Sequence, residues 1–180
     1  MRIQHHTPDG TNMKARRGML SNTISVEVDV SVLRMLRLGD TDNILIDRID
    51  LIQKYYEILL LRLAADDQQG VRVHVRPHLL LPDGTDRCLT YLKNGAEVIM
   101  WQVDQATIPA SLPNLTIVRT KRTNTVMREG FLAIKTPNSY RVLAVWRDMN
   151  NETKGVLVTN PHAAEDVVTQ LDAIIQPPLR

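Results

Sequence analysis

The stretch Leu60-Leu-Arg-Leu-Ala-Ala-Asp-Asp-Gln-Gln-Gly-Val-Arg-Val-His-Val75 contains the transition that decides the fold. Its first part ends a long segment, residues 42–66, in which apolar side chains recur every three or four positions, as on one face of an α-helix. After Gly70 the period changes to two, because valines alternate with polar side chains, and this predicts a β-strand. A long helix followed directly by such a strand is typical of α/β folds.

The rest of the chain continues this mixture of helices and strands. An alternating segment at residues 23–30 predicts an early strand, and residues 85–93 predict a short helix. Further strands are predicted at residues 97–103, 115–119, 130–135, 141–146 and 155–159, the last two joined as a hairpin. Asn160 and Pro161 predict the start of a final amphipathic helix. We therefore expect an α/β fold with a mixed, largely parallel sheet flanked by helices.

The composition fits one folded domain. The chain has 180 residues, of which 43% are hydrophobic and 23% charged, and its formal net charge is +2. These values argue against wholesale disorder and give no global reason to expect a nucleic-acid or membrane partner. No segment is apolar enough to act as a secretory signal or to cross a bilayer, so we expect a cytoplasmic protein. We expect residues 1–21 to form a flexible tail and residues 22–180 a single α/β domain.

Two parts of the sequence resemble a phospholipase-D-like domain. The first is the stretch quoted above with residues 89–98, Leu-Thr-Tyr-Leu-Lys-Asn-Gly-Ala-Glu-Val, which match a helix, a Gly-Val-x-Val strand and a helix closed by Gly-Ala-x-Val. The second is Val145-Trp-Arg-Asp, a polar turn, Gly155-Val-Leu-Val-Thr-Asn-Pro161 and an amphipathic helix. The resemblance covers roughly residues 45–175 and implies a phospholipase-D-like fold.

One departure from that family bears on the chemistry. Its catalytic members carry a His-x-Lys followed by an Asp five residues after the Lys, and the His attacks phosphorus. None of the five histidines here has a Lys two positions on, and the corresponding stretch, near residues 114–130, contains no histidine. We therefore expect no enzyme activity and no catalytic residue. We also expect no cofactor and no metal site, because His74 and His78 have no third ligand nearby.

The resemblance implies a regulatory role instead. The non-catalytic branch is similar to the ligand-sensing effector domains of some bacterial and archaeal transcription regulators. Catalytic members with one such domain pair up to complete a site, so we expect a homodimer here. The helix over residues 42–66 offers surface for pairing, because its apolar face is wide enough to be buried on two sides.

Five basic side chains are the candidates for ligand binding. Arg72, His74 and Arg76 alternate along one face of the predicted strand, and Lys121 and Arg122 lie in a later basic segment. Brought together at one sheet edge, they would bind the phosphate or carboxylate of a small anionic ligand. The alternative is a solvated strand face and a solvated loop.

Residues 23–63 also permit a different function. A strand, a short helix, a turn and a longer helix is the order of a ribbon-helix-helix unit, which reads DNA with the outward side chains of paired strands, and the rest of the chain would then be a C-terminal α/β accessory domain. Those side chains would be Ser25, Glu27 and Asp29. Two carboxylates facing phosphates are unfavourable, so DNA remains the less favoured partner.

Overall fold

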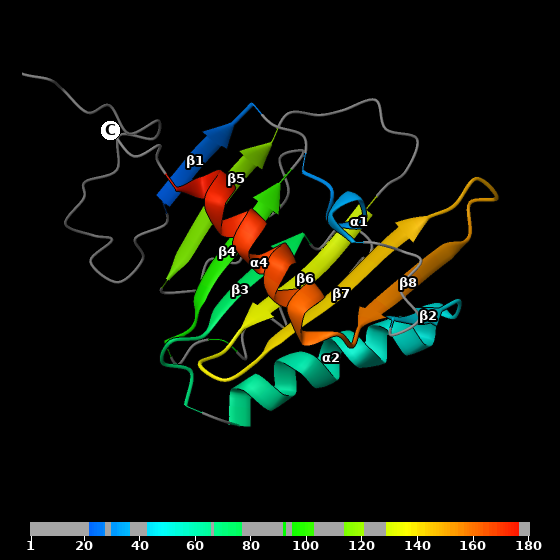
Figure 1. Cartoon of the computed structure of the whole chain (residues 1–180), viewed down its shortest axis with the longest axis horizontal. Helices are drawn as coiled ribbons and strands as arrows, with labels where there is room; N and C mark the ends of the chain where they lie inside the picture. The colour runs from blue at the N-terminus through cyan, green and yellow to red at the C-terminus, as the bar shows by residue number, and fades with distance from the viewer. Residues whose placement is uncertain are drawn as a thin grey trace, which may run out of the picture.

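The computed structural model describes residues 22–27, 30–36, 43–65, 67–76, 92, 95–102, 114–120 and 129–176 (Figure 1). The helices in these ranges are α1 (Val32–Met35), α2 (Ile49–Ala65) and α4 (Pro161–Ile175). The strands are β1 (Asn22–Val26), β2 (Asn43–Ile46), β3 (Arg72–Arg76), β4 (Glu97–Gln102), β5 (Leu115–Thr120), β6 (Glu129–Lys135), β7 (Tyr140–Arg147) and β8 (Thr153–Val158). The fold is α/β, as the sequence predicts.

The described strands form a single mixed sheet in the order β1-β5-β4-β3-β6-β7-β8-β2. The strands β1, β5, β4 and β3 run parallel to one another. From β3 onward every pairing is antiparallel, through β6, β7 and β8 to β2. The expectation of a largely parallel sheet is therefore wrong, because antiparallel pairings outnumber parallel ones. The physical reason is the short connection from β6 to β7 and from β7 to β8, since a tight turn reverses the direction of the chain.

Helices cover both faces of the sheet. On one face, α2 buries Ile52, Tyr56, Leu60 and Leu63 against alternate side chains of the central strands. On the other face, α1 and α4 cover a second apolar cluster, and α4 crosses the sheet face that is turned toward the viewer in Figure 1. The two clusters share the strands because successive side chains of a strand point to opposite faces.

The start of α4 is confirmed at the predicted residues. Asn160 is the N-cap, and its side-chain oxygen accepts hydrogen bonds from the backbone N–H groups of His162 and Ala163 at 2.9 and 3.3 Å. Pro161 occupies the first helical position, where its missing N–H costs nothing.

The long helix predicted over residues 42–66 is wrong at its N-terminal end. Residues Asn43–Ile46 form β2, which pairs with β8 at one edge of the sheet, and helix α2 begins only at Ile49. A short apolar run is compatible with a strand and with a helix. Here it forms a strand, because it pairs with the edge of β8. Burial of α2 on two sides is not seen among the described residues, where Ile58 and Leu61 are 44% and 42% exposed.

Two other expectations fall mainly outside the described residues. These are the flexible tail over residues 1–21 and the short helix over residues 85–93, of which only Leu92 is described. The early strand is confirmed over residues 22–26, at the edge of the main sheet beside β5.

Candidate functional site

Strand β3 brings three of the predicted binding residues onto one face of the sheet. Arg72 and His74 contact α4, and Arg76 lies on the same face over Phe131, while Val73 and Val75 join the apolar cluster beneath α2. This face is not solvated, because His74 is 0% and Arg76 only 6% exposed. The alternation of side chains along β3 was predicted from the sequence, but the covering of this face by α4 was not.

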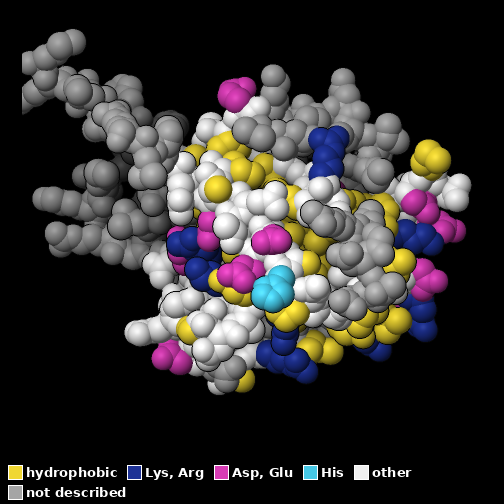
Figure 2. Space-filling model, in the orientation of Figure 1, with side chains coloured by type: hydrophobic (Ala, Val, Ile, Leu, Met, Phe, Trp, Pro, Cys, Tyr) yellow, Lys and Arg dark blue, Asp and Glu magenta, His cyan; other side chains and the backbone are white. Residues whose placement is uncertain are grey.

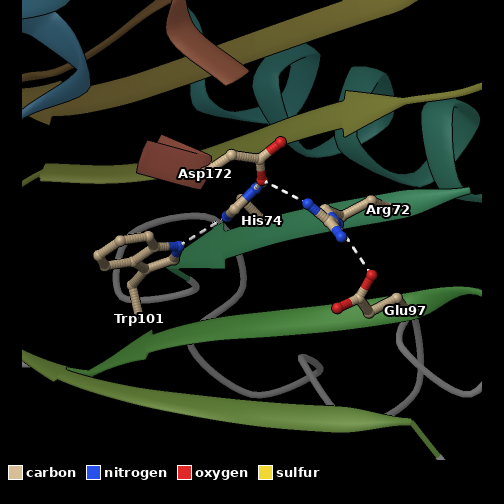
Figure 3. A network of polar contacts seen from close by, with 5 residues as sticks. All are labelled: Arg72, His74, Glu97, Trp101 and Asp172. Atoms are coloured by element: carbon tan, nitrogen blue, oxygen red, sulfur yellow. Dashed lines mark hydrogen bonds and ion pairs between the residues drawn. The ribbon is translucent and has the colours of Figure 1, made fainter. Parts of the chain in front are cut away.

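His74 is held by hydrogen bonds at both ring nitrogens (Figure 3). Its Nε2 lies 2.8 Å from Oδ1 of Asp172 on α4, and its Nδ1 accepts a hydrogen bond of 3.1 Å from the indole N–H of Trp101 on β4. Since Trp101 can only donate, Nδ1 must be unprotonated. The imidazole is therefore neutral, with its single proton on Nε2 directed at Asp172.

Arg72 extends the same network to a second carboxylate. Its Nη1 lies 2.9 Å from the Asp172 oxygen that also binds His74, and its Nε donates to Glu97 at 2.8 Å (Figure 3). Arg72 and Glu97 lie opposite each other in the register of β3 and β4. We call these five residues, Arg72, His74, Glu97, Trp101 and Asp172, the histidine network.

Burial and charge act on the network in opposite directions. Burial lowers the pKa of His74, although the hydrogen bond to Asp172 favours the protonated form. Burial alone would raise the pKa of Asp172, but the hydrogen bonds from His74 and Arg72 outweigh it, and the pKa lies below its usual value. The stable charge state is thus neutral His74 beside an ionised Asp172, whose counterion is Arg72.

This arrangement stabilises the fold, and it leaves neither ring nitrogen of His74 free to act as a nucleophile. A histidine that attacks an electrophile needs a free ring nitrogen facing the substrate. In His74 both nitrogens are bonded to protein groups, and the side chain is fully buried. Its bonds instead connect β3 to β4 and to α4.

Arg76 belongs to a separate cluster at the other end of β3. Its guanidinium donates to the carbonyl of Val30 at 2.8 Å and lies 5.2 Å from the ring centroid of Phe131. The neighbouring carboxylate of Glu129 accepts hydrogen bonds from the backbone N–H groups of Val32 and Leu33 at 2.6 and 3.2 Å. Burial raises the pKa of Glu129, while the Ser31 hydroxyl and the charge of Arg76 act against that rise. This cluster ties α1 to the sheet.

The predicted binding set is therefore only partly assembled. Arg72 and His74 meet through Asp172, whereas Arg76 has other partners. Lys121 and Arg122 lie outside the described residues. Among the residues that the structure describes, no group of three or more His, Cys, Asp or Glu side chains is placed to hold a metal ion. The described helices also include none with the length and hydropathy needed to span a membrane.

Sequence reasoning missed the acidic half of the network. Asp172 stands four residues after Val168 and one after Leu171, on the apolar side of α4. A carboxylate within the apolar stripe of a helix needs a buried partner, and this was the available signal. The hydrogen bond from Trp101 to His74 could not be predicted in this way, because a tryptophan in a strand packs equally well without a hydrogen bond.

Comparisons with protein-family models, with curated proteins and with solved structures found no match. The assignment of a function therefore depends on the geometry described above.

Proposed function

We propose that this chain is a non-catalytic regulatory domain of phospholipase-D-like architecture, which acts by binding. The observation that carries the proposal is His74, whose two ring nitrogens are both engaged within the protein core. The histidine nearest to a catalytic arrangement in the sequence thus serves as a structural group, as expected in a branch that has lost phosphoryl chemistry.

The order of the elements supports the proposed architecture. Helix α2 is followed by β3 and then by its parallel neighbour β4, in the order that the resemblance implies. The second resembling part corresponds to the β7–β8 hairpin and α4. The helix expected between β3 and β4 lies in residues of which only Leu92 is described.

The kind of partner is suggested by the contacts that the basic side chains already make. Arg72 is paired with Asp172 and Glu97, so an anionic ligand at this place would have to compete with two carboxylates. Most of the exposed large apolar side chains among the described residues, in contrast, belong to α2 and β2, namely Ile44, Leu45, Ile49, Ile58 and Leu61. Apolar surface of this kind favours a protein partner over a small anion.

The DNA-binding alternative gains no support from the segment on which it depends. In a ribbon-helix-helix unit the first strand pairs with its own copy. Here β1 pairs in parallel with β5 of the same chain, and β2 separates α1 from α2.

A hydrolysis assay tests the absence of catalysis. We expect the purified chain, with or without added divalent cations, to release no nitrophenolate from bis(p-nitrophenyl) phosphate above the buffer rate. Hydrolysis that is lost in His74→Gln but kept in His162→Gln would overturn the proposal. His162 is a suitable control because it lies exposed on α4.

A gel-shift titration tests the alternative. We expect no binding of duplex DNA by the purified chain at physiological salt. Binding that weakens steeply with salt and disappears when residues 1–40 are deleted would favour the DNA reader and overturn the proposed function.

A further inference from the structure

The outer side of helix α2 carries a line of exposed side chains at helical spacing. Its members are Lys54, Ile58, Leu61, Arg62 and Ala65, which recur at intervals of three and four residues. Ile58 and Leu61, at its centre, are 44% and 42% exposed. We call these five residues the outer stripe. In Figure 2, hydrophobic and basic side chains lie next to each other along the lower right of the molecule, where Figure 1 places α2 and β2.

The charge on the outer stripe is positive and uncompensated. Lys54 and Arg62 lie one helical turn before and after the exposed isoleucine, and neither side chain forms an ion pair or a hydrogen bond within the residues that the structure describes. The nearby carboxylates are already engaged. Asp50 binds Arg48 at 2.6 Å, and the half-buried Glu57 has a contact of its own within the chain. The apolar centre of the stripe therefore has a free cation on each side.

The spacing of the outer stripe fits a helix as its partner. Residues 54–65 cover about 17 Å of helix length, at about 1.5 Å per residue, and their exposed side chains form one narrow line. A second helix laid along this line would bury Ile58 and Leu61 against its own apolar side chains, three and four positions apart. Acidic side chains beside that apolar stripe would pair with Lys54 and Arg62.

Apolar and basic side chains also occur together on helices that lie on anionic membranes. Such helices push apolar side chains into the headgroup region, whereas Ile58 and Leu61 are more than half covered by their neighbours. Two free cations are also fewer than the roughly four to eight basic residues of a cluster that binds anionic lipid. These observations favour a protein helix over a membrane surface.

We propose that the outer stripe of α2 binds an amphipathic helix of a different protein, in which acidic side chains flank an apolar stripe. This names the chemistry of the partner and rests on the proposed binding function. Ile58 and Leu61 supply the affinity, because they lose their remaining contact with water. Lys54 and Arg62 select acidic helices and reject basic ones.

Two synthetic peptides test the proposal on the full chain. Both are amphipathic sequences of about 18 residues, long enough to form a helix, with the same leucine stripe. One carries glutamate and the other lysine beside that stripe. Fluorescence anisotropy of the labelled peptides measures binding, and we expect the acidic peptide to bind at least about 10-fold more tightly than the basic one. Equal binding of the two peptides, or no binding of either, would overturn the proposal.

Ile58→Asp tests the apolar centre of the stripe. It should weaken the binding of the acidic peptide about 10-fold or more, because it places a charge at the middle of the interface. Met149→Asp is the matched control, since Met149 is 94% exposed but lies in the turn between β7 and β8, outside α2. Circular dichroism should give the same helix and strand content for both variants. An equal loss of binding in both would show that the peptide binds elsewhere.

A charge reversal tests the selection of the partner. The double variant Lys54→Glu with Arg62→Glu should lose its affinity for the acidic peptide and gain affinity for the basic one, because the apolar centre is unchanged and only the signs of the flanking charges differ. A gain of this kind cannot come from unfolding. A double variant that still prefers the acidic peptide would contradict the role of these two cations.

Vesicles that contain phosphatidylserine test the membrane as the other source of negative charge. We expect the chain to stay in the supernatant when such vesicles are sedimented. Sedimentation of the wild type but not of Ile58→Asp, without a preference for the acidic peptide, would assign the stripe to a membrane and overturn the proposal.

The failure of this inference differs from that of the proposed function. The absence of any preference for the acidic peptide would overturn the assignment of the outer stripe, while the hydrolysis assay would still find no activity. Hydrolysis that depends on His74 would instead overturn the non-catalytic function, whatever the peptides do.

Discussion

Helices α2 and α4 cover opposite faces of one sheet, yet their outer sides differ. Helix α4 buries Ala164, Val167, Val168 and Leu171, and Glu165, Asp166, Thr169 and Gln170 are among its exposed residues. Helix α2 buries a similar set but also presents Ile58 and Leu61 outward. The contrast shows that the outer side of α4 is polar, whereas α2 leaves large apolar side chains exposed.

The two helices are also attached by different forces. Helix α4 has a polar contact in its last turn, because Asp172 reaches the sheet and binds His74 and Arg72. Helix α2 is held by close apolar packing, and Ile52 lies so near to Gly155 that the strand has no room for a side chain there. Hydrogen bonds specify one orientation, while apolar packing tolerates small adjustments.

The largest effect is expected from removing the polar contact of α4. Asp172→Ala should lower the free energy of unfolding by about 3 kcal/mol, because it leaves the Nε2–H of His74 unsatisfied and removes a partner of Arg72. Urea denaturation measures this change. Asp166→Ala, on the exposed side of the same helix, should change stability by less than about 0.5 kcal/mol. Equal losses in the two variants would mean that the histidine network does not hold α4.

A smaller effect is expected where α2 packs on the sheet. A Cβ at residue 155 would lie 2.9 and 3.0 Å from two side-chain carbons of Ile52, which is itself fully buried. Gly155→Ala should therefore lower the free energy of unfolding by about 2 kcal/mol in the same denaturation assay. Adding Ile52→Val, which removes one of the two crowded carbons, should restore part of this loss. Simple addition of the two single effects would contradict the steric explanation.

The smallest effect is a pH dependence confined to the α4 side. The pKa of His74 lies below its usual value because of burial, so below pH 6.5 or so the unfolded chain binds a proton that the folded chain excludes. The free energy of unfolding should therefore decrease as the pH falls through that range, by up to about 1.4 kcal/mol per pH unit for this one group.

The pH dependence is measured by urea denaturation between pH 7.5 and 5.5. His74→Gln should make the profile flatter, whereas His162→Gln should leave it unchanged. Glu129 acts in the opposite direction, because its pKa is raised by burial, and its contribution is the same in all three proteins. A wild-type slope that survives in His74→Gln would show that another group titrates.

The sequence predicts those elements whose signals are local. The start of α4 follows from Asn160 and Pro161, and the β7–β8 hairpin follows from a polar turn between two apolar runs. The identity of β2 does not follow, because residues 43–46 become a strand only through pairing with β8, more than a hundred residues later in the chain. The predominance of antiparallel pairings was missed because strand order is a property of the whole sheet.

The candidate site was predicted to a smaller extent. The alternation along β3 correctly places Arg72, His74 and Arg76 on one face. Nothing within β3 indicates that a helix nearly a hundred residues away covers that face. The prediction of a ligand site considered the basic side chains but not the carboxylates that pair with them. One of these carboxylates, Asp172, stands within the apolar stripe of the last helix in the sequence.

The hydrogen bond between His74 and Asp172 joins residues 98 positions apart. Closing so long a loop costs conformational entropy before any contact repays it, so we expect this pair to form late in folding. Helix α2 with β3, and the β7–β8 hairpin with α4, are by contrast nearly contiguous in sequence and can form early. The indole of Trp101, bonded to the same imidazole, is therefore placed to act as a spectroscopic reporter of the final step, in which the two halves of the chain come together.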